Sequence, residues 1–210
     1  MLYYILFTLL IRQVLSADPF SKSITYVPAA IQDGPSQGQF ISSGNGLDSP
    51  KIHPVNGSAY DWWYFDAVSD DAKASFVIVF YTASPAGFPS ASFPSTVDSI
   101  TIDAEFPNGT SFAASIPASS ATIVTVGDGT TGIFEGTGSG WTSTPDMTRY
   151  LLTVDAPSFG IKGTFQLDSV STPVSIFRIN ILTVITNKDG FTHRLHLLII
   201  PVVLPCTART

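Results

Sequence analysis

Residues 60–66 read YDWWYFD, a segment with five aromatic side chains in seven positions. Aromatic residues are enriched in β-strands, so residues 61–68 are predicted to form a strand. A polar segment, SDDA at 69–72, follows, and residues 74–83 then read ASFVIVFYTA. β-branched and aromatic residues dominate this second run as well, which is typical of a strand. The two runs together predict a β-hairpin with a short polar loop.

Similar short runs continue along the chain at regular spacing. Further strands are expected at about 97–106, 110–116, 121–126, 131–137, 148–155 and 159–168. Asn108-Gly109 lies between two of these runs and is the strongest hairpin signal in the chain. No stretch shows a helical period, and the glycines at 136, 138 and 140 are read as a turn before Trp141. Short strands joined by tight turns predict an all-β fold, either a sandwich or an antiparallel barrel.

The first hairpin presents two different faces. Successive side chains of a strand point to opposite sides, so Trp63 and Phe65 face one way while Trp62 and Tyr64 face the other. Residues 76–81 are apolar on both faces, whereas an antiparallel strand with one face in water alternates. We therefore expect the outer face to be covered, either by the N-terminal arm of residues 18–59 or by a second domain.

Composition and charge exclude several classes of function. The chain has 210 residues, with 10 Lys plus Arg against 16 Asp plus Glu and a formal net charge of -6. Nucleic-acid binding requires clustered positive charge, so no nucleic-acid partner is expected. The single cysteine, Cys206, excludes an internal disulfide framework. His193 and His196 have no obvious carboxylate partner, and we expect neither a metal site nor a cofactor.

The N-terminus has the features of a targeting segment. Residues 2–11 read LYYILFTLLI, an apolar run too short to span a bilayer but suited to a signal peptide that ends at Ala17. The alternative is a buried N-terminal strand. A signal peptide predicts a secreted protein with no stable membrane insertion after cleavage. Two sequons, which begin at Asn56 and Asn108, agree with this route and are the predicted glycosylation sites.

The C-terminal segment differs from the rest of the chain. Residues 176–210 carry four basic residues and one acid, whereas the preceding part is acidic. We interpret 174–210 as an atypical tail, encoded by a retained intron or a shifted reading frame; two buried strands are the alternative. The predicted organisation is a signal peptide at 1–17, an extended arm at 18–59, a barrel domain at 60–173 and this tail.

The acid-Trp-Trp-Tyr pattern at 61–64 resembles the hydroxyneurosporene-synthase-like family, which includes the carotenoid hydratases. The likeness continues through FVIVFYTASPAGFP at 76–89. The sequence is most similar to the fungal branch of lipocalin-like Diels–Alderases, and within it to hetero-Diels–Alderases of tropolone–sesquiterpenoid pathways. This resemblance implies an antiparallel lipocalin-like barrel. Members have two such halves, so it also implies that this chain corresponds to a truncated N-terminal half.

The same resemblance implies a ligand cavity against the hairpin at 61–83. A cycloaddition needs no nucleophile and no metal, only a site that holds the reactants together and one or two hydrogen-bond donors. The expected substrate is a hydrophobic polyketide or terpenoid, and Trp62 is expected in the core. The predicted site consists of two catalytic groups, Tyr64 and Asp66, and three substrate-binding residues, Trp63, Phe65 and Tyr81.

Two other functions fit the same residues. The first is a hydratase in which an aspartic acid protonates a terpenoid alkene, and the second is a carrier that binds a hydrophobic ligand without turnover. Hydration adds the mass of one water, and a carrier forms no product. The sequence has no Gly-x-Ser-x-Gly nucleophile elbow and no dinucleotide- or phosphate-binding glycine motif, which argues against hydrolase and nucleotide chemistry.

Overall fold

A computed structural model describes residues 22–39, 45–87 and 96–169, together with the backbone of 182–185. Within these ranges the chain is almost entirely β-structure, with no α-helix and a single 3-10 turn, η1, at Pro157–Phe159. All strand pairs are antiparallel. The prediction of an antiparallel all-β fold is therefore confirmed.

The strands form two main sheets and one small ladder. The seven-stranded sheet consists, in spatial order, of β1 (Lys22–Pro28), β8 (Ser120–Val126), β9 (Gly129–Glu135), β10 (Ser139–Ser143), β11 (Arg149–Ala156), β12 (Ile161–Ser169) and β13 (Leu182–Ile185). The four-stranded sheet consists of β4 (Tyr60–Val68), β5 (Ser75–Ala83), β6 (Asp98–Glu105) and β7 (Ser111–Pro117). The ladder pairs β2 (Gln37–Gly38) with β3 (Ile52–His53).

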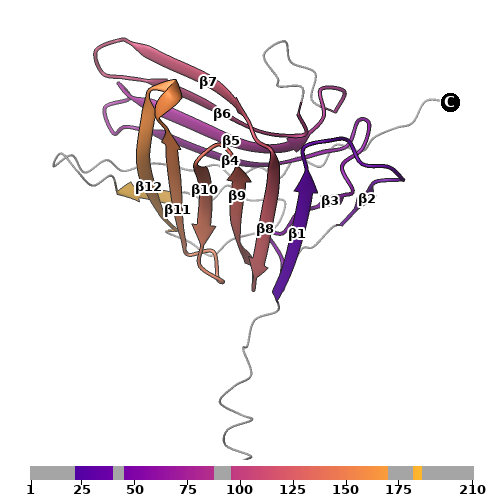
Figure 1. Ribbon diagram of the computed structural model, residues 1–210. Helices are drawn as coiled ribbons and strands as arrows, with labels where there is room; N and C mark the ends of the chain where they lie inside the picture. Colours follow the sequence, from indigo (N-terminus) through magenta and orange to yellow (C-terminus); the bar gives the residue numbers. More distant parts are fainter. Residues whose placement is uncertain (1–21, 40–44, 88–95, 170–181, 186–210) are drawn as a thin grey trace, which may run out of the picture.

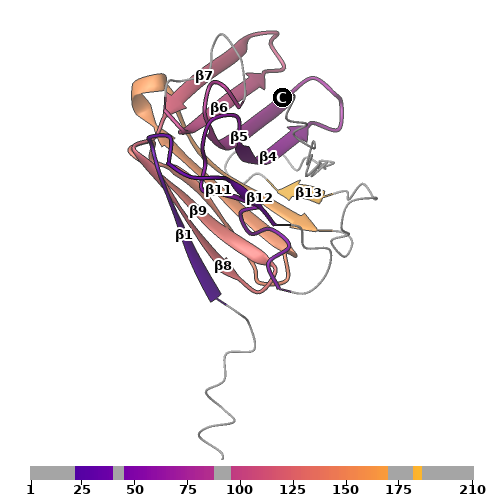
Figure 2. The ribbon, with the colours of Figure 1, turned by 90° about the vertical axis from the view of Figure 1, so that its right-hand side faces the viewer.

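The two sheets pack face to face. Figure 1 shows the strands of the four-stranded sheet running across those of the seven-stranded sheet, and Figure 2 shows the two layers from the side. The core lies between them, where Phe80 of β5 meets Trp141 of β10 with ring centroids 4.9 Å apart. In the described residues no strand of one sheet pairs with a strand of the other, so the barrel is not closed there.

The predicted hairpins are present. β4 pairs with β5 from Tyr60 opposite Ala83 to Val68 opposite Ser75, and the polar turn between them is tied by a bond from the Ser69 nitrogen to the Ala74 oxygen. Asn108-Gly109 turns β6 into β7, with Gly109 at φ 79°. Since this φ lies in the left-handed region, glycine suits the position.

The short strand β10 was not predicted from the sequence. The glycine-rich segment before Trp141 was expected to be a turn; Gly136 and Gly138 do form one, but Gly140 already belongs to β10 and pairs with Ile133. A side chain on Gly140 would meet the Gly132 oxygen at 2.2 Å, so glycine is there to let two strands approach closely. Sequence periodicity carries no signal for such an approach.

Both ends of the chain lie largely outside the described residues. In the arm predicted at 18–59, residues 22–28 form the edge strand β1, which pairs with β8. In the tail predicted at 174–210, residues 182–185 pair with the end of β12. The predicted signal peptide, His193, His196 and Cys206 lie outside the described residues.

The packing of Trp141 leads to a testable prediction for two glycines. A Cβ on Gly132 would lie 2.1 Å from Trp141 Cη2, whereas a Cβ on Gly163 of β12 would have its nearest neighbour at 3.8 Å. Gly132→Ala is expected to lower the free energy of unfolding by about 1–3 kcal/mol, because it overpacks the core. Gly163→Ala is the matched strand control. Urea unfolding measures both, and equal stability of the two variants would contradict this account of the core.

Candidate functional site

The strand β4 places the predicted site residues on two opposite faces. Trp63 is 6 % exposed and Phe65 is 3 % exposed, and both point into the core between the sheets. Tyr64 packs on the other side of the sheet, against a cluster that contains Tyr81. Asp66 follows Tyr64 on that outer side by the alternation of the strand. Because the sheet separates the two groups, the five residues do not line one common cavity.

The two neighbouring tryptophans lie on the sides opposite to those expected. Trp62, which was expected in the core, is partly buried on the outer face and contacts Tyr81 edge to face, with ring centroids 6.1 Å apart. Trp63, which was expected beside the ligand, packs against Trp141 with ring centroids 4.9 Å apart and the ring planes tilted by 35°. The alternation was correctly predicted, but it does not say which face meets the second sheet.

The outer face of the four-stranded sheet carries an aromatic cluster. We define the outer aromatic cluster as Tyr60, Trp62, Tyr64, Val77, Val79, Tyr81 and Ala83. Burial, with the nearby Asp66 carboxyl, raises the pKa of Tyr64, and burial also raises the pKa of Tyr81. Both hydroxyls are therefore neutral hydrogen-bond donors at physiological pH. The apolar side chains on the outer face of β5 belong to this cluster, whereas those on its inner face belong to the core between the sheets.

A second group of polar side chains lies on the inner side of β4, around Asp61. We define the interior acid cluster as Asp48, Lys51, Asp61, Thr130 and Tyr150. Burial raises the pKa of Asp48 to about 7, although a hydrogen bond from Thr130 and the charge of Lys51 partly oppose this shift. Burial raises the pKa of Asp61 to about 6, against the opposing bonds from the backbone nitrogens of Lys51 and Trp62. These carboxyls can therefore hold a proton close to neutral pH.

Nothing in the local sequence pattern singled out Asp48 or Tyr150 as site residues. Asp48 lies in a segment rich in Gly, Ser and Asn that reads as a loop, and Tyr150 lies in a strand where an aromatic residue is ordinary core. They are about a hundred residues apart in the chain, so only the packing of the two sheets brings them together. Asp61 belongs to the acid-Trp-Trp-Tyr pattern and was visible from the sequence.

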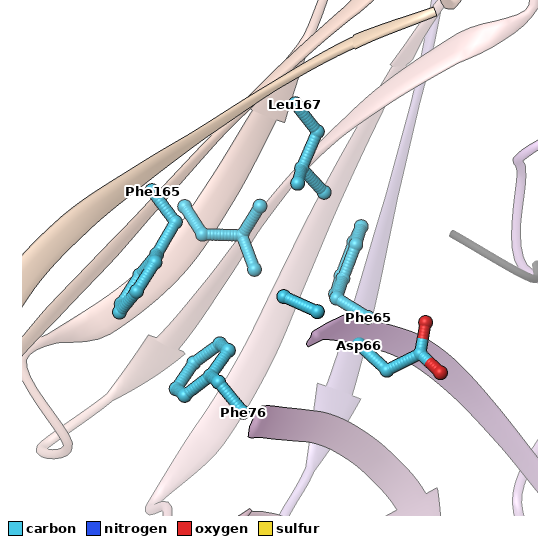
Figure 3. A pocket seen from close by; sticks show the side chains of 7 residues that line it. Phe65, Asp66, Phe76, Phe165 and Leu167 are labelled. Carbon is cyan, nitrogen blue, oxygen red and sulfur yellow. The ribbon is translucent and has the colours of Figure 1, made fainter. Parts of the chain in front are cut away.

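A small cavity opens at one edge of the core. It is lined by Phe65, Asp66, Ala67, Phe76, Leu152, Phe165 and Leu167. Figure 3 shows the apolar side chains turned toward it and the Asp66 carboxyl directed away. Its volume of about 10 Å³ is the space of a single water molecule, so it does not hold a polyketide or terpenoid. Phe76 and Phe165 stack across its edge at 4.2 Å.

Within the described ranges, no three side chains of His, Cys, Asp or Glu are grouped so that they could hold a metal ion. The chemistry available there is that of aromatic walls, tyrosine hydroxyls and protonated carboxyls. Such groups position a substrate, donate hydrogen bonds and transfer protons.

Comparison with known proteins identifies the family. The family model described as Diels-Alderase-like matches residues 31–176. The chain belongs to this Diels-Alderase-like family. The match covers most of both sheets, and the predicted resemblance to the fungal Diels–Alderase branch is thereby confirmed.

Individual members come from fungi. The chain is 34% identical over 149 residues to the quinolone epoxide rearrangement protein asqO of Emericella nidulans, which covers 70% of this chain and 40% of that protein. It is 34% identical over 140 residues to the Diels-Alderase phmD of Phaeosphaeria nodorum, covering 64% and 37%. The chain thus spans about two fifths of the length of these curated relatives.

The fold resembles that of a solved crystal structure. The crystal structure of CghA with Sch210972 superposes with a TM-score of 0.59 at 21% identity, covering 71% of this chain and 40% of that chain. At this identity the likeness concerns the fold alone. It confirms the predicted lipocalin-like class of the Diels-Alderase-like family, with the barrel open in the described part of this chain.

A third carboxyl, Asp98 at the start of β6, makes the pH dependence of stability testable. Its side chain is fully buried, neither oxygen has a hydrogen bond of ordinary geometry, and burial raises its pKa to about 7. An acid whose folded pKa is raised binds more protons in the folded than in the unfolded state. The stability of the protein should therefore fall as the pH rises from about 4 to about 7, and Asp48 and Asp61 act in the same direction.

Thermal unfolding between pH 4 and pH 8 measures this dependence. Asp98→Asn imitates the protonated acid and is expected to flatten the decline. Asp71→Asn is the matched control, because the hydrogen bond from Ser69 lowers the pKa of Asp71 and so places its titration below this window. A stability that rises with pH in wild type, or an unchanged slope in Asp98→Asn, would contradict the role assigned to burial.

Proposed function

We propose that this protein promotes a Diels–Alder cycloaddition of a hydrophobic small molecule in fungal secondary metabolism. The observation that carries the proposal is the family match over residues 31–176, together with relatives named Diels-Alderase. The chain spans only part of the length of those relatives. The proposal therefore concerns the whole protein to which residues 22–169 belong.

The chemistry of the outer aromatic cluster suits this reaction. A cycloaddition is accelerated when the site holds diene and dienophile in one reactive arrangement, and it gains further from a donor to a carbonyl oxygen. Trp62 and Tyr60 offer a wall, with their rings 5.6 Å apart, and Tyr64 and Tyr81 offer neutral hydroxyls. The finer proposal is a hetero-Diels–Alder reaction on a polyketide or tropolone–sesquiterpenoid substrate.

The interior acid cluster favours a second candidate function. Asp48 and Asp61 have raised pKa values of about 7 and about 6, as an acid that protonates a substrate at neutral pH requires. Such an acid suits hydration of a terpenoid alkene or an acid-promoted rearrangement, and two relatives are named quinolone epoxide rearrangement proteins. Hydration adds the mass of water, whereas rearrangement keeps the mass and changes the skeleton. If the protein binds the substrate but forms no product, the result favours a carrier of hydrophobic ligands.

The decisive assay tests the two tyrosine hydroxyls of the outer face. The longest protein that the gene encodes is incubated with an o-quinone methide and a strained terpene alkene. The rate and stereoselectivity of product formation are compared with those of the uncatalysed reaction. Tyr64→Phe and Tyr81→Phe keep their packing and are expected to lose about 1–3 kcal/mol of transition-state stabilisation, or roughly 5- to 150-fold in rate.

Tyr26→Phe is the control, because Tyr26 is 58% exposed on the other sheet. Melting curves accompany each variant. If both outer-face variants fold normally and match wild type in rate and stereoselectivity, the reaction does not take place at this cluster.

We also propose that the protein enters the secretory pathway and is glycosylated, chiefly at Asn108. Asn108 is exposed in the β6–β7 turn, where its side-chain oxygen accepts bonds from the backbone nitrogen of Thr110 at 3.0 Å and from its hydroxyl at 2.7 Å. Asn56 is partly buried. Its side-chain nitrogen donates to the Gly34 oxygen, and its side-chain oxygen accepts a hydrogen bond from the Ser36 hydroxyl. Among the described residues, no helix is long and apolar enough to cross a membrane.

Expression in a fungal secretory host tests this route. Asn108→Gln is expected to remove most of the mass that peptide N-glycosidase releases, and Asn56→Gln to remove little. Secretion into the medium is followed in parallel. Protein that stays in the cytoplasm without any enzyme-sensitive mass would refute both the secretory route and the glycan.

A further inference from the structure

The β6–β7 hairpin ends in a turn that gathers three side chains on one side. Glu105 pairs with Ser111. The next positions outward, Phe106 and Thr110, therefore face each other, and the Phe106 nitrogen donates to the Thr110 oxygen at 2.9 Å. Facing residues of an antiparallel pair have their side chains on the same side. The Thr110 hydroxyl donates to the Asn108 side-chain oxygen at 2.7 Å, so Asn108 lies on that side as well.

The backbone of this turn fixes the spacing between Phe106 and Asn108. The Gly109 nitrogen donates to the Phe106 oxygen at 2.9 Å, which closes a four-residue turn with Pro107 at its second position. Proline is favoured there because its φ already suits the turn. Gly109 has a φ of 79°, the left-handed conformation that completes a three-residue hairpin loop. The phenylalanine is therefore held two positions before the asparagine by a loop of defined geometry.

An open cleft lies beside this turn. Its volume is about 330 Å³, and it is lined by Lys73, Glu105, Phe106, Pro107, Gly109 and Ser111. The register of the sheet puts the β4–β5 turn next to the β6–β7 turn, so Lys73 comes from the first hairpin and the other residues from the second. Phe106 is 48% exposed. Pockets of about 300–1,000 Å³ hold small ligands in other proteins, so the cleft has room for one sugar ring.

The residue types in the cleft suit a sugar. A pyranose ring carries C–H groups on its faces and hydroxyl or amide groups around its edge. An aromatic ring packs against such a C–H face, because the contact removes apolar surface of both partners from water. The Lys73 ammonium can donate hydrogen bonds to the ring substituents, and the Glu105 carboxylate can accept them. Lys73 pairs with Asp71 at 3.5 Å, but both are exposed, and such a surface ion pair is weak.

The asparagine at this cleft is the first residue of a sequon, Asn108-Gly109-Thr110. Its side-chain oxygen accepts the bonds from Thr110, and neither bond occupies the side-chain nitrogen, the atom to which a sugar is attached. Glycan transfer joins this nitrogen to the anomeric carbon of N-acetylglucosamine. The lipid diphosphate that carried the sugar leaves, and the amide loses one proton. The first sugar is thereby tethered next to the Phe106 ring.

We propose that the first N-acetylglucosamine of a glycan on Asn108 lies in this cleft, with its C–H face on the Phe106 ring and its polar substituents toward Lys73 and Glu105. The sugar covers an exposed phenylalanine and connects it to the turn, so it stabilises this end of the four-stranded sheet. The proposal rests on the secretory route proposed above and is independent of the reaction that the protein promotes.

A double-mutant cycle tests the contact on the full chain secreted by a fungal host. Endoglycosidase H trims each glycan to a single N-acetylglucosamine, and intact mass reports whether Asn108 carries it. Asn108→Gln removes the sugar, Phe106→Ser removes the ring, and Tm is measured for the wild type, both single variants and the double variant. The sugar is expected to raise Tm by about 2–4 °C when Phe106 is present, the shift that a small gain in stability gives in a domain of this size. In the Phe106→Ser background it should leave Tm unchanged.

Phe159→Ser is the matched control. Phe159 is 42% exposed and lies in η1, between two strands of the other sheet, so this variant should keep the full gain from the sugar. Nuclear magnetic resonance gives a second readout. The ring current of Phe106 should shift the protons on the C–H face of the sugar upfield in wild type, and Phe106→Ser should abolish that shift. The wild-type shift does not depend on whether any variant folds.

The outcomes separate this contact from the secretory route. An equal gain in Tm with and without the Phe106 ring, unshifted sugar protons in wild type, or secreted protein whose Asn108 carries no sugar would each overturn the contact and leave the route intact. Protein that stays in the cytoplasm would overturn the route and the sugar in the cleft together. The assay of the outer-face tyrosines is independent of all these results.

Discussion

The packing of Trp63 against Trp141 is the contact on which the two-sheet arrangement depends. Trp141 also lies within 4.9 Å of the Phe80 ring and within 5.9 Å of Phe65, so one indole touches aromatic residues from both strands of the first hairpin. The indole fits only because Gly132 on the neighbouring strand has no side chain. Large aromatic surfaces buried in this way supply much of the free energy that holds two crossed sheets together.

The core also contains polar groups, and the free-energy cost of removing them from water has to be offset. Carboxyls at Asp48, Asp61 and Asp98 are surrounded by protein, and burial raises the pKa of each toward neutrality. A neutral acid is far cheaper to bury than a carboxylate, so these side chains are tolerated while they keep their protons. Groups with such shifted pKa values cluster at functional sites in many proteins, and here Asp48 adjoins both Trp63 and Tyr150.

The four-stranded sheet presents two chemically different surfaces. Its inner surface combines the Trp63 indole with the nearby acids Asp48 and Asp61, and its outer surface combines the Trp62 indole with the tyrosines Tyr64 and Tyr81. The relatives are more than twice as long as the region that this chain matches. Both β4 and β5 contribute side chains to the two surfaces.

The sequence alone determined most of the strands, the hairpins at 61–83 and at Asn108-Gly109, and the alternation along YDWWYFD, because these follow from local propensity and from turn residues. It also carried the family resemblance in the acid-Trp-Trp-Tyr pattern. It did not determine which side of β4 is inside, since Trp62 and Trp63 are equally apolar and only the second sheet distinguishes them. Nor did it show that Asp48 and Tyr150 meet, because that proximity exists only after residues about a hundred positions apart are packed across the core, and local pattern carries no information about such long-range contacts.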